Sequence, residues 1–369
     1  MSVSPVSAGS LAMSRFVLKA IRKINKGIWT MKSFIKLAAI AIPLFANACV
    51  SDPKSHFMLS ELDTKQQQDY AAAKVILLGE QHDNPAHHQI QAEIVERLGR
   101  EGRLRAVVFE QIDWTEQGVL SQLKPSNMED LPKKLDWDKS GWPSYEYYRP
   151  IVESAVKYNA KVVAGGLPKN RLKLLYSHGY EGAFTASEIE RLRLRVPLDG
   201  EAVTLISKEI FDGHCKMIPE DHVAKMIPIQ RARDAALLRG YQNEAALDGV
   251  TVFILGSGHA RKEFGLPSLF RNTAPTIKLW SVGMQEAGAE PFPAGAYDKV
   301  WVTEKFERPD PCEEMKKHID KDKKDGAAPT TPTAAPDAPA TAPDQVKPDD
   351  AAAPEAPAAD DASEEDAGE

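Results

Sequence analysis

Short, continuous apolar runs that alternate with longer helical patterns are the feature that most constrains how this chain can fold. Four such runs cover residues 74–79, 104–110, 160–166 and 250–256, and each ends in Gly or Glu. Such runs are typical of parallel strands that helices bury on both faces, because every position then needs an apolar side chain. The sequence therefore predicts an α/β fold with a mainly parallel β-sheet and crossover helices.

Two later runs, 276–283 and 299–304, are further strand candidates. Residues 187–248 are rich in Glu, Arg, Leu and Ala at helical spacing, which predicts a helical insertion standing beside the sheet. The predicted folded domain spans residues 49–325, a length that suits one large domain. Three cysteines are too few for a disulfide-built scaffold, so a hydrophobic core must hold this fold.

Charge is spread unevenly along the chain. Residues 326–369 hold 11 acidic side chains and one basic one, with frequent Ala and Pro. Such a segment buries too little apolar surface to fold, so we expect a disordered acidic tail there. The net charge of -7 is concentrated in that tail. The mildly acidic body therefore gives no support to nucleic-acid binding.

Residues 1–48 have the layout of an export signal, with Met31 as the expected start. Lys32 and Lys36 precede an apolar run over 37–48 that ends in small residues. This run is 12 residues long, whereas a membrane-spanning helix needs roughly 20. We therefore expect cleavage and export rather than a transmembrane anchor.

Cys49 directly follows Ala46-Asn47-Ala48, an arrangement that resembles a bacterial lipobox. A lipobox cysteine is acylated and anchors the protein to a membrane in the cell envelope. Ala-Asn-Ala also satisfies the cleavage rule of an ordinary exported protein, so a soluble product is the alternative. Both interpretations place the body outside the cytoplasm, where Cys215 and Cys312 could form a disulfide if they meet.

The densest polar cluster follows the first predicted strand and reads GEQHDNPAHH over 79–88. Asn84 and Pro85 suit the N-cap and first position of a helix. Glu80, His82 and His87 then gather at the carboxyl end of the sheet, where ligand sites of open α/β folds lie. His88 lies at the edge of the same helix face.

A second strand end repeats this pattern. Residues 256–259 read Gly-Ser-Gly-His and match the Gly-x-x-His spacing of 79–82. If the two strands are neighbours, His82 and His259 face one cleft, and Glu110 at the end of the second strand joins them with Glu80. Two imidazoles and two carboxylates suit a divalent transition metal or a general acid–base pair.

Several motifs in this order resemble the ChaN family of iron-regulated, haem-binding lipoproteins of the Tiki superfamily. The resemblance runs from about Lys74 to Cys312 and rests on VILLGEQHDNPAHHQIQ, VVFEQID, YRPIVESAVKYNAKVVAGGLPK, QRARDAALL, ILGSGHARKEFGLP and KVWVTEKFERPDPC. It implies a parallel sheet with a helical appendage, a lipid anchor and a role in haem or iron uptake. Superfamily relatives include erythromycin esterases and Tiki proteases. They imply the alternative, a metal-dependent hydrolase whose catalytic and metal-binding residues are Glu80, His82, Glu110 and His259.

Haem binding needs an apolar slot, an axial ligand and cations for the propionates. Tyr145, Tyr147 and Tyr148 offer phenolates for ferric iron, and Lys169 and Arg171 could meet the propionates. The predicted haem-contacting set also includes His87 and His88. The resemblance further implies haem held between two protomers, and hence a homodimer. A structural envelope protein that uses its acidic tail for contacts is a third possibility.

Lipidation of Cys49 is directly testable. A Cys49→Ala variant should move from the membrane fraction to the soluble envelope fraction, because its anchor depends on the acyl chains. Fractionation followed by immunoblotting measures this, and equal membrane retention of both forms would contradict the prediction.

Overall fold

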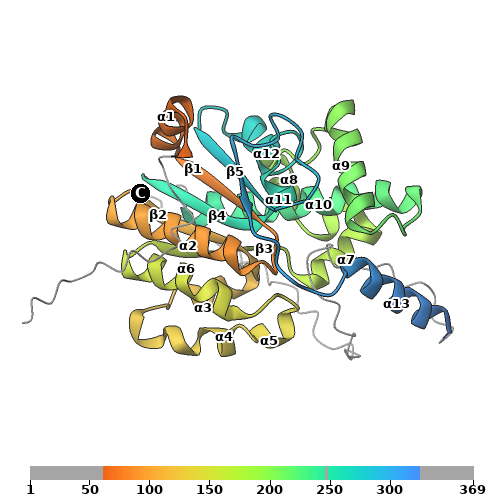
Figure 1. Cartoon of the computed structure of the whole chain (residues 1–369), viewed down its shortest axis with the longest axis horizontal. Coiled ribbons are helices and arrows are strands. Elements are labelled where there is room, and N and C mark those ends of the chain that lie inside the picture. Colours follow the sequence, from red (N-terminus) through yellow and green to blue (C-terminus); the bar gives the residue numbers. More distant parts are fainter. Residues whose placement is uncertain (1–60, 246–247, 325–369) are drawn as a thin grey trace, which may run out of the picture. The chain divides into compact units, whose positions relative to one another are not determined.

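The computed structural model describes residues 61–245 and 248–324 (Figure 1). The predicted signal, Cys49 and the acidic tail lie outside the described residues. None of the described helices is long and apolar enough to cross a membrane.

Six parallel strands form one sheet in the order β3-β2-β4-β1-β5-β6. The α/β fold class is thus confirmed, and the four early runs are neighbours. The strands are β1 (Val75–Glu80), β2 (Leu104–Asp113), β3 (Lys161–Gly166), β4 (Val250–Gly256), β5 (Leu279–Glu286) and β6 (Lys299–Thr303). β5 begins three residues later than predicted, because Ile277 donates to the Ala274 carbonyl and closes a turn before the strand.

Helices cover both faces of the sheet, as Figure 1 shows for α2 and α6 on one side and α10, α11 and α12 on the other. Alternate side chains of β1 enter two separate cores: Ile76 and Leu78 pack in one, Val75 and Leu77 in the other. The first core is covered by α1 (Thr64–Ala72), α2 (Pro85–Arg100), α3 (Gln117–Leu120), α4 (Leu131–Lys134), α5 (Trp137–Ser140) and α6 (Tyr145–Lys157). The second is covered by α7 (Lys169–His178), α8 (Ala186–Arg191), α10 (Glu220–Gly240), α11 (Ser257–Ala260) and α12 (Leu266–Thr273).

The segment 187–248, predicted to stand beside the sheet, is only partly separate from it. Its longest helix, α10, packs on the sheet face, because Ala232, Ala235 and Ala236 are small enough for close approach. Gly240 lies so near β3 that a Cβ there would sit 2.8 Å from the Ala164 carbonyl oxygen. The helix α9 (Gly200–Gly213) packs against α10 in a third, smaller core.

The chain leaves the neighbouring strands β1 and β4 toward opposite faces of the sheet. After β1 it enters α2, which begins at the predicted place: the Asn84 side chain accepts from the Ala86 amide, and Pro85 opens the helix. After β4 it enters α11 on the other face. Adjacent strands whose connections diverge in this way leave a crevice at the carboxyl edge, the usual ligand position in open α/β sheets.

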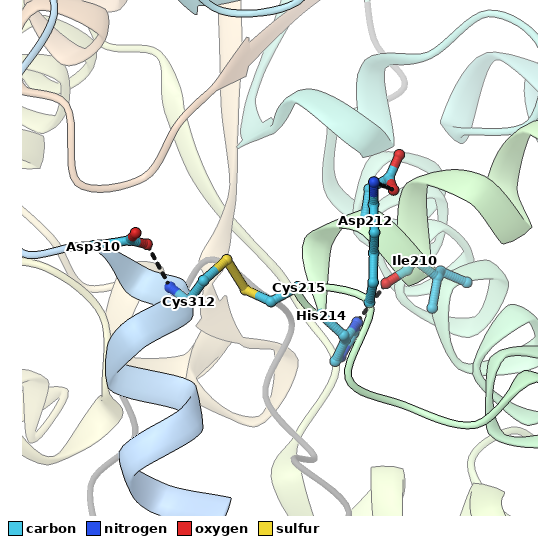
Figure 2. The surroundings of a disulfide bond; sticks show 7 residues. Ile210, Asp212, His214, Cys215, Asp310 and Cys312 are labelled. Carbon is cyan, nitrogen blue, oxygen red and sulfur yellow. Dashed lines mark hydrogen bonds and ion pairs between the residues drawn. A yellow bond between two sulfur atoms is a disulfide. The ribbon is translucent and has the colours of Figure 1, made fainter.

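Beyond β6 the chain runs along residues 304–310 into α13 (Pro311–Lys324). Cys312, near the start of α13, forms a disulfide with Cys215, which lies between α9 and α10 (Figure 2). The two cysteines that the sequence left unassigned therefore meet across 97 residues of sequence.

Close packing at Gly79 fixes where the turn after β4 lies, so enlarging this residue should weaken the fold. A Cβ at Gly79 would meet the Ala260 Cβ and the Ser257 Cα, both at 2.9 Å. We expect Gly79→Ala to lower the free energy of unfolding by about 1–3 kcal/mol. Chemical denaturation measures it. The matched control is Gly118→Ala in α3, where a Cβ has open space and helix propensity favours Ala. Equal stability of both variants would contradict this interpretation of the packing.

Candidate functional site

The polar residues at the carboxyl edge form two networks on opposite faces of the sheet. Phe109 of β2 and Leu78 of β1 both pair with Ile254 of β4, so the residues that follow stay level: Glu110 with Gly79, and Gln111 with Glu80. Side chains alternate along strands, so Glu80 and Glu110 point to opposite faces. The single cluster expected from Glu80, His82, Glu110 and His259 is therefore not formed. Within the described ranges, no group of three or more His, Cys, Asp or Glu is arranged to hold a metal ion.

The first network surrounds the buried carboxylate of Glu80. Its Oε1 accepts from His82 Nδ1 at 2.7 Å, Gln111 Nε2 at 3.0 Å and the Tyr148 hydroxyl at 3.0 Å. Its Oε2 accepts from Gln91 Nε2. Burial alone raises the pKa of a carboxyl, but the nearby imidazoles and these donors outweigh it, and the pKa of Glu80 lies below its ordinary value. Glu80 is therefore an ionised carboxylate saturated with donors.

The three candidate tyrosines differ in burial and in their contacts. Tyr148 is fully buried; burial and the charge of Glu80 hold the pKa of its phenol well above the usual value, so it stays a neutral donor. Tyr145 is buried against Trp137, and burial raises its pKa to about 12. Tyr147 is half-buried, with its ring stacked on His88 at 5.5 Å between centroids. Tyr145 and Tyr148 are thus packing residues, because their side of α6 faces the core.

The two helix histidines are structural in this arrangement. His87 Nδ1 accepts from the Gln81 amide at 2.9 Å, which leaves Nε2 to donate to Thr303 Oγ1 at 3.0 Å. Burial lowers the pKa of His87 to about 4, so it is neutral. His88 Nε2 donates to the His82 carbonyl at 2.7 Å. Both imidazoles are buried in this conformation, and their contact with haem stays a prediction.

Two pairs of rings lie on this side of the edge, and we call their four residues, Trp142, His82, Tyr147 and His88, the row of rings. Trp142 packs edge-on against His82 at 4.8 Å between centroids, and Tyr147 stacks on His88. Trp142 and Tyr147 are half-buried, whereas the imidazoles of His82 and His88 are buried. Lys169 Nζ donates to the Ser140 carbonyl at 2.8 Å, which ties the start of α7 to the loop that carries Trp142. Arg171, also on α7, is exposed.

The second network, on the opposite face, centres on Glu110 and His259. Glu110 Oε1 accepts from an Arg233 guanidinium nitrogen at 2.6 Å and lies 3.2 Å from His259 Nε2. Its Oε2 accepts from the Gly256 amide at 2.8 Å. His259 Nδ1 donates to Asp234 Oδ1 at 2.8 Å. The imidazole therefore lies between two buried carboxylates.

Sequence analysis quoted Arg233 and Asp234 in the motif QRARDAALL but did not name them as site residues, and α10 brings both to this network. Both lie in a helix whose neighbouring positions are mostly Ala and Leu and are buried. A charged pair within such a buried apolar helix needs partners, because an unpaired buried charge is unfavourable. A charged pair in an apolar helix was the signal in the sequence. It could not by itself identify Glu110 and His259 as the partners.

In the second network, protonation of His259 balances the charge of the buried carboxylates. Burial lowers the pKa of His259, but Glu110 and Asp234 outweigh it and raise that pKa to about 10. The Glu110 carboxyl, although buried, has a pKa well below its ordinary value beside His259 and Arg233. Burial raises the pKa of Asp234. His259 is an imidazolium at neutral pH, so neither ring nitrogen offers a lone pair to a metal in this arrangement.

The His259 proton makes a pH-dependent contribution to stability. Its folded pKa of about 10 exceeds the ordinary 6.5, so the contribution is complete below pH 6.5 and is lost as pH rises through about 10. At pH 6 we expect His259→Gln to lower the free energy of unfolding by about 3–5 kcal/mol, since it leaves buried carboxylates unpaired. Denaturant titrations from pH 6 to 11 should show this difference shrinking. His178→Gln, at an exposed position, is the control. A difference that stays constant across this range would contradict the ion-pair assignment.

Comparisons with known proteins identify the family of this chain. A family model described as haem-binding uptake, Tiki superfamily, ChaN matches residues 67–270, more than half of the chain. No curated protein matches. Among solved structures, a ChaN of Campylobacter jejuni with cofacially bound haem is 21% identical, with 65% of this chain and 91% of that chain covered and a TM-score of 0.48. An erythromycin esterase, EreC, in its open conformation is 12% identical, with 62% and 75% covered and a TM-score of 0.33. By the family match, this chain belongs to the ChaN haem-binding uptake family of the Tiki superfamily.

Proposed function

We propose that this protein binds haem in the cell envelope and takes part in haem or iron uptake. The family match over residues 67–270 carries the proposal. The matched range includes both networks, the row of four rings and α7. We therefore propose that the haem site lies at the carboxyl edge of the sheet.

The side chains in and beside the row of rings are of the kinds that bind haem. No hydrogen bond joins the Tyr147 hydroxyl to any residue in the described part of the chain, so its oxygen is available to ferric iron. Trp142 supplies a flat apolar wall, and Lys169 and Arg171 supply cations for the two propionates. When bound, haem supplies an iron centre that takes a hard anionic ligand such as a phenolate. We assign Tyr147 as that ligand.

Export and dimerisation belong to the same proposal. The Cys215–Cys312 disulfide supports an oxidising compartment, since such bonds rarely persist in the cytosol. We place the protein in the envelope as a lipoprotein attached through Cys49. A wall made of Trp142 and Tyr147 covers one face of a planar ligand. A second protomer would cover the other face, which supports a homodimer formed around haem.

A second candidate function is hydrolysis at the other network. The observation that favours it is the buried imidazolium of His259 between Glu110 and Asp234, with Arg233 beside it. Such a group donates a proton or stabilises a developing anion. The sequence predicted a metal-dependent hydrolase. We do not propose a metal for this hydrolysis, because the donors of both networks are engaged with protein partners.

Haemin titration tests the main proposal. Added to the purified protein, haemin should give a saturable Soret shift and raise the mass toward a dimer. Tyr147→Phe should weaken binding about tenfold or more, since it keeps the ring and deletes the ligating oxygen. Tyr176→Phe is the matched control, because Tyr176 on α7 is 49% exposed and is not in the row. Failure of haemin to titrate, or equal loss in both variants, would contradict the assignment.

Variants of the second network separate the two candidate functions. Glu110→Gln and His259→Gln should leave the haem titration largely unchanged, because both residues lie on the opposite face of the sheet. The same variants should abolish any ester hydrolysis that the wild type shows. Ester turnover by a protein that binds no haemin would replace the haem proposal with the hydrolase one.

A further inference from the structure

Residues 304–312, which we call the strap, cross the carboxyl edge of the sheet after β6. Near its middle, Arg308 Nε lies 2.6 Å from Asp83 Oδ2, in the turn that follows β1. The Arg308 guanidinium also pairs with Glu286 at the end of β5. These ion pairs attach the strap to the ends of two neighbouring strands.

The far end of the strap is attached covalently to the loop between α9 and α10. Cys312 is bonded to Cys215, which follows α9 (Figure 2). α9 itself contacts the chain that leaves β4, because Glu209 accepts from Arg261 at 2.6 Å. The disulfide therefore joins the strap to the elements beside the β4 turn.

The distance between the two attachments is short. Arg308 and Cys312 are four residues apart, a stretch that reaches at most about 14 Å. Within that reach the chain passes from the turn after β1, where Arg308 meets Asp83, to the end of α9, whose Glu209 contacts Arg261. The strap thus bridges the place where the connections of β1 and β4 diverge, which is the ligand position of this fold class.

The disulfide is the principal tie between α13 and the rest of the protein. No α13 side chain that the structure describes is buried. The ion pair between Lys317 and Glu314 lies within the helix. An isolated helix of this length is only marginally stable in water. Without the disulfide, α13 keeps the partial burial of Met315 and Ile319, and the strap keeps the ion pairs of Arg308.

The other half of the disulfide lies in a strained loop. Cys215 and Lys216 have φ of 56° and 59°, a left-handed conformation that is unfavourable for side chains of this kind. Both cysteines are half-buried rather than enclosed, so an external thiol has access to them. The Cys215 and Lys216 amides donate to the Asp212 and Phe211 carbonyls, so the end of α9 holds this conformation.

We propose that the Cys215–Cys312 disulfide is a redox latch, a bond whose reduction frees the strap and opens the crevice between the β1 and β4 turns. An external dithiol is the reductant. Its thiolate attacks one sulfur, the protein S–S bond breaks, and a mixed disulfide forms. The second thiol then displaces the protein sulfur, so that two cysteine thiols and an oxidised reductant result and two electrons are transferred. The ion pairs of Arg308 remain as a second, non-covalent attachment.

The first test is hydrogen exchange on the full-length protein with both Cys215→Ser and Cys312→Ser. At labelling times of seconds to minutes, amides of the strap and α13 should exchange about tenfold faster or more than in the wild type. Strands β1 and β4 should remain protected in both. Wild type reduced with dithiothreitol should match the variant, and reoxidation should reverse the change. Lys317→Gln, which removes an ion pair within α13, is the control and should change nothing in the strap.

The effect on a ligand is the second readout, and it rests on the proposed haem function. Stopped-flow mixing with haemin should show association and dissociation both faster by about tenfold in the double variant, with a smaller change in Kd. Adding Arg308→Gln to the double variant should accelerate them further.

Unchanged exchange in the strap of the double variant would overturn the latch. Rapid exchange throughout β1 and β4 at the same short times would also overturn it, because the disulfide would then be a brace for the whole domain. If haemin binds neither form, the haem proposal fails, and the exchange result alone decides the latch. Equal haemin rates in two forms that both bind it would reject control of the crevice.

Discussion

The ionised carboxylate of Glu80 holds together one whole side of the sheet edge. It is buried at the end of β1 and receives hydrogen bonds from Gln111 of β2, Gln91 of α2 and Tyr148 of α6. A buried charge is tolerated only with such a set of partners, and removing one of them leaves desolvated polar groups unpaired. Glu80 therefore helps to position α2 and α6, which carry His88 and Tyr147, two of the rings in the row.

The register of the parallel strands decides what Glu80 can and cannot contact. Because Glu110 is level with Gly79 rather than with Glu80, its side chain enters the opposite face. There it meets Arg233 from α10 and His259 from the turn after β4. A shift of one residue would have put both carboxylates on the same face and produced the four-residue cluster expected from the motifs. The separation of the networks is thus a property of strand pairing.

Features that depend on local chemistry were predictable from the sequence. The apolar runs identified the strands, and Asn84 with Pro85 identified the start of α2. Features that depend on which elements become neighbours were not. The motif Gly-x-x-His is the same after β1 and after β4, but nothing in either motif states the face to which the chain turns. The tyrosines of α6 show the same limit, since the rotation of the helix against the sheet buries Tyr148 and leaves Tyr147 half-buried.

The two networks differ in the ligands that they favour. On the Glu80 side, the rings of Trp142 and Tyr147 form a largely apolar boundary, and the cations lie at its margin on α7. On the Glu110 side, an imidazolium and a guanidinium face two carboxylates, and each buried charge already has a partner. A planar apolar ligand with two carboxylates loses little by binding at the first boundary. At the second it would have to displace buried ion pairs, which is strongly unfavourable. The strap contacts the turn after β1 and is bonded to the loop after α9, whose Glu209 contacts Arg261. In the proposed latch, its position therefore controls access to either network.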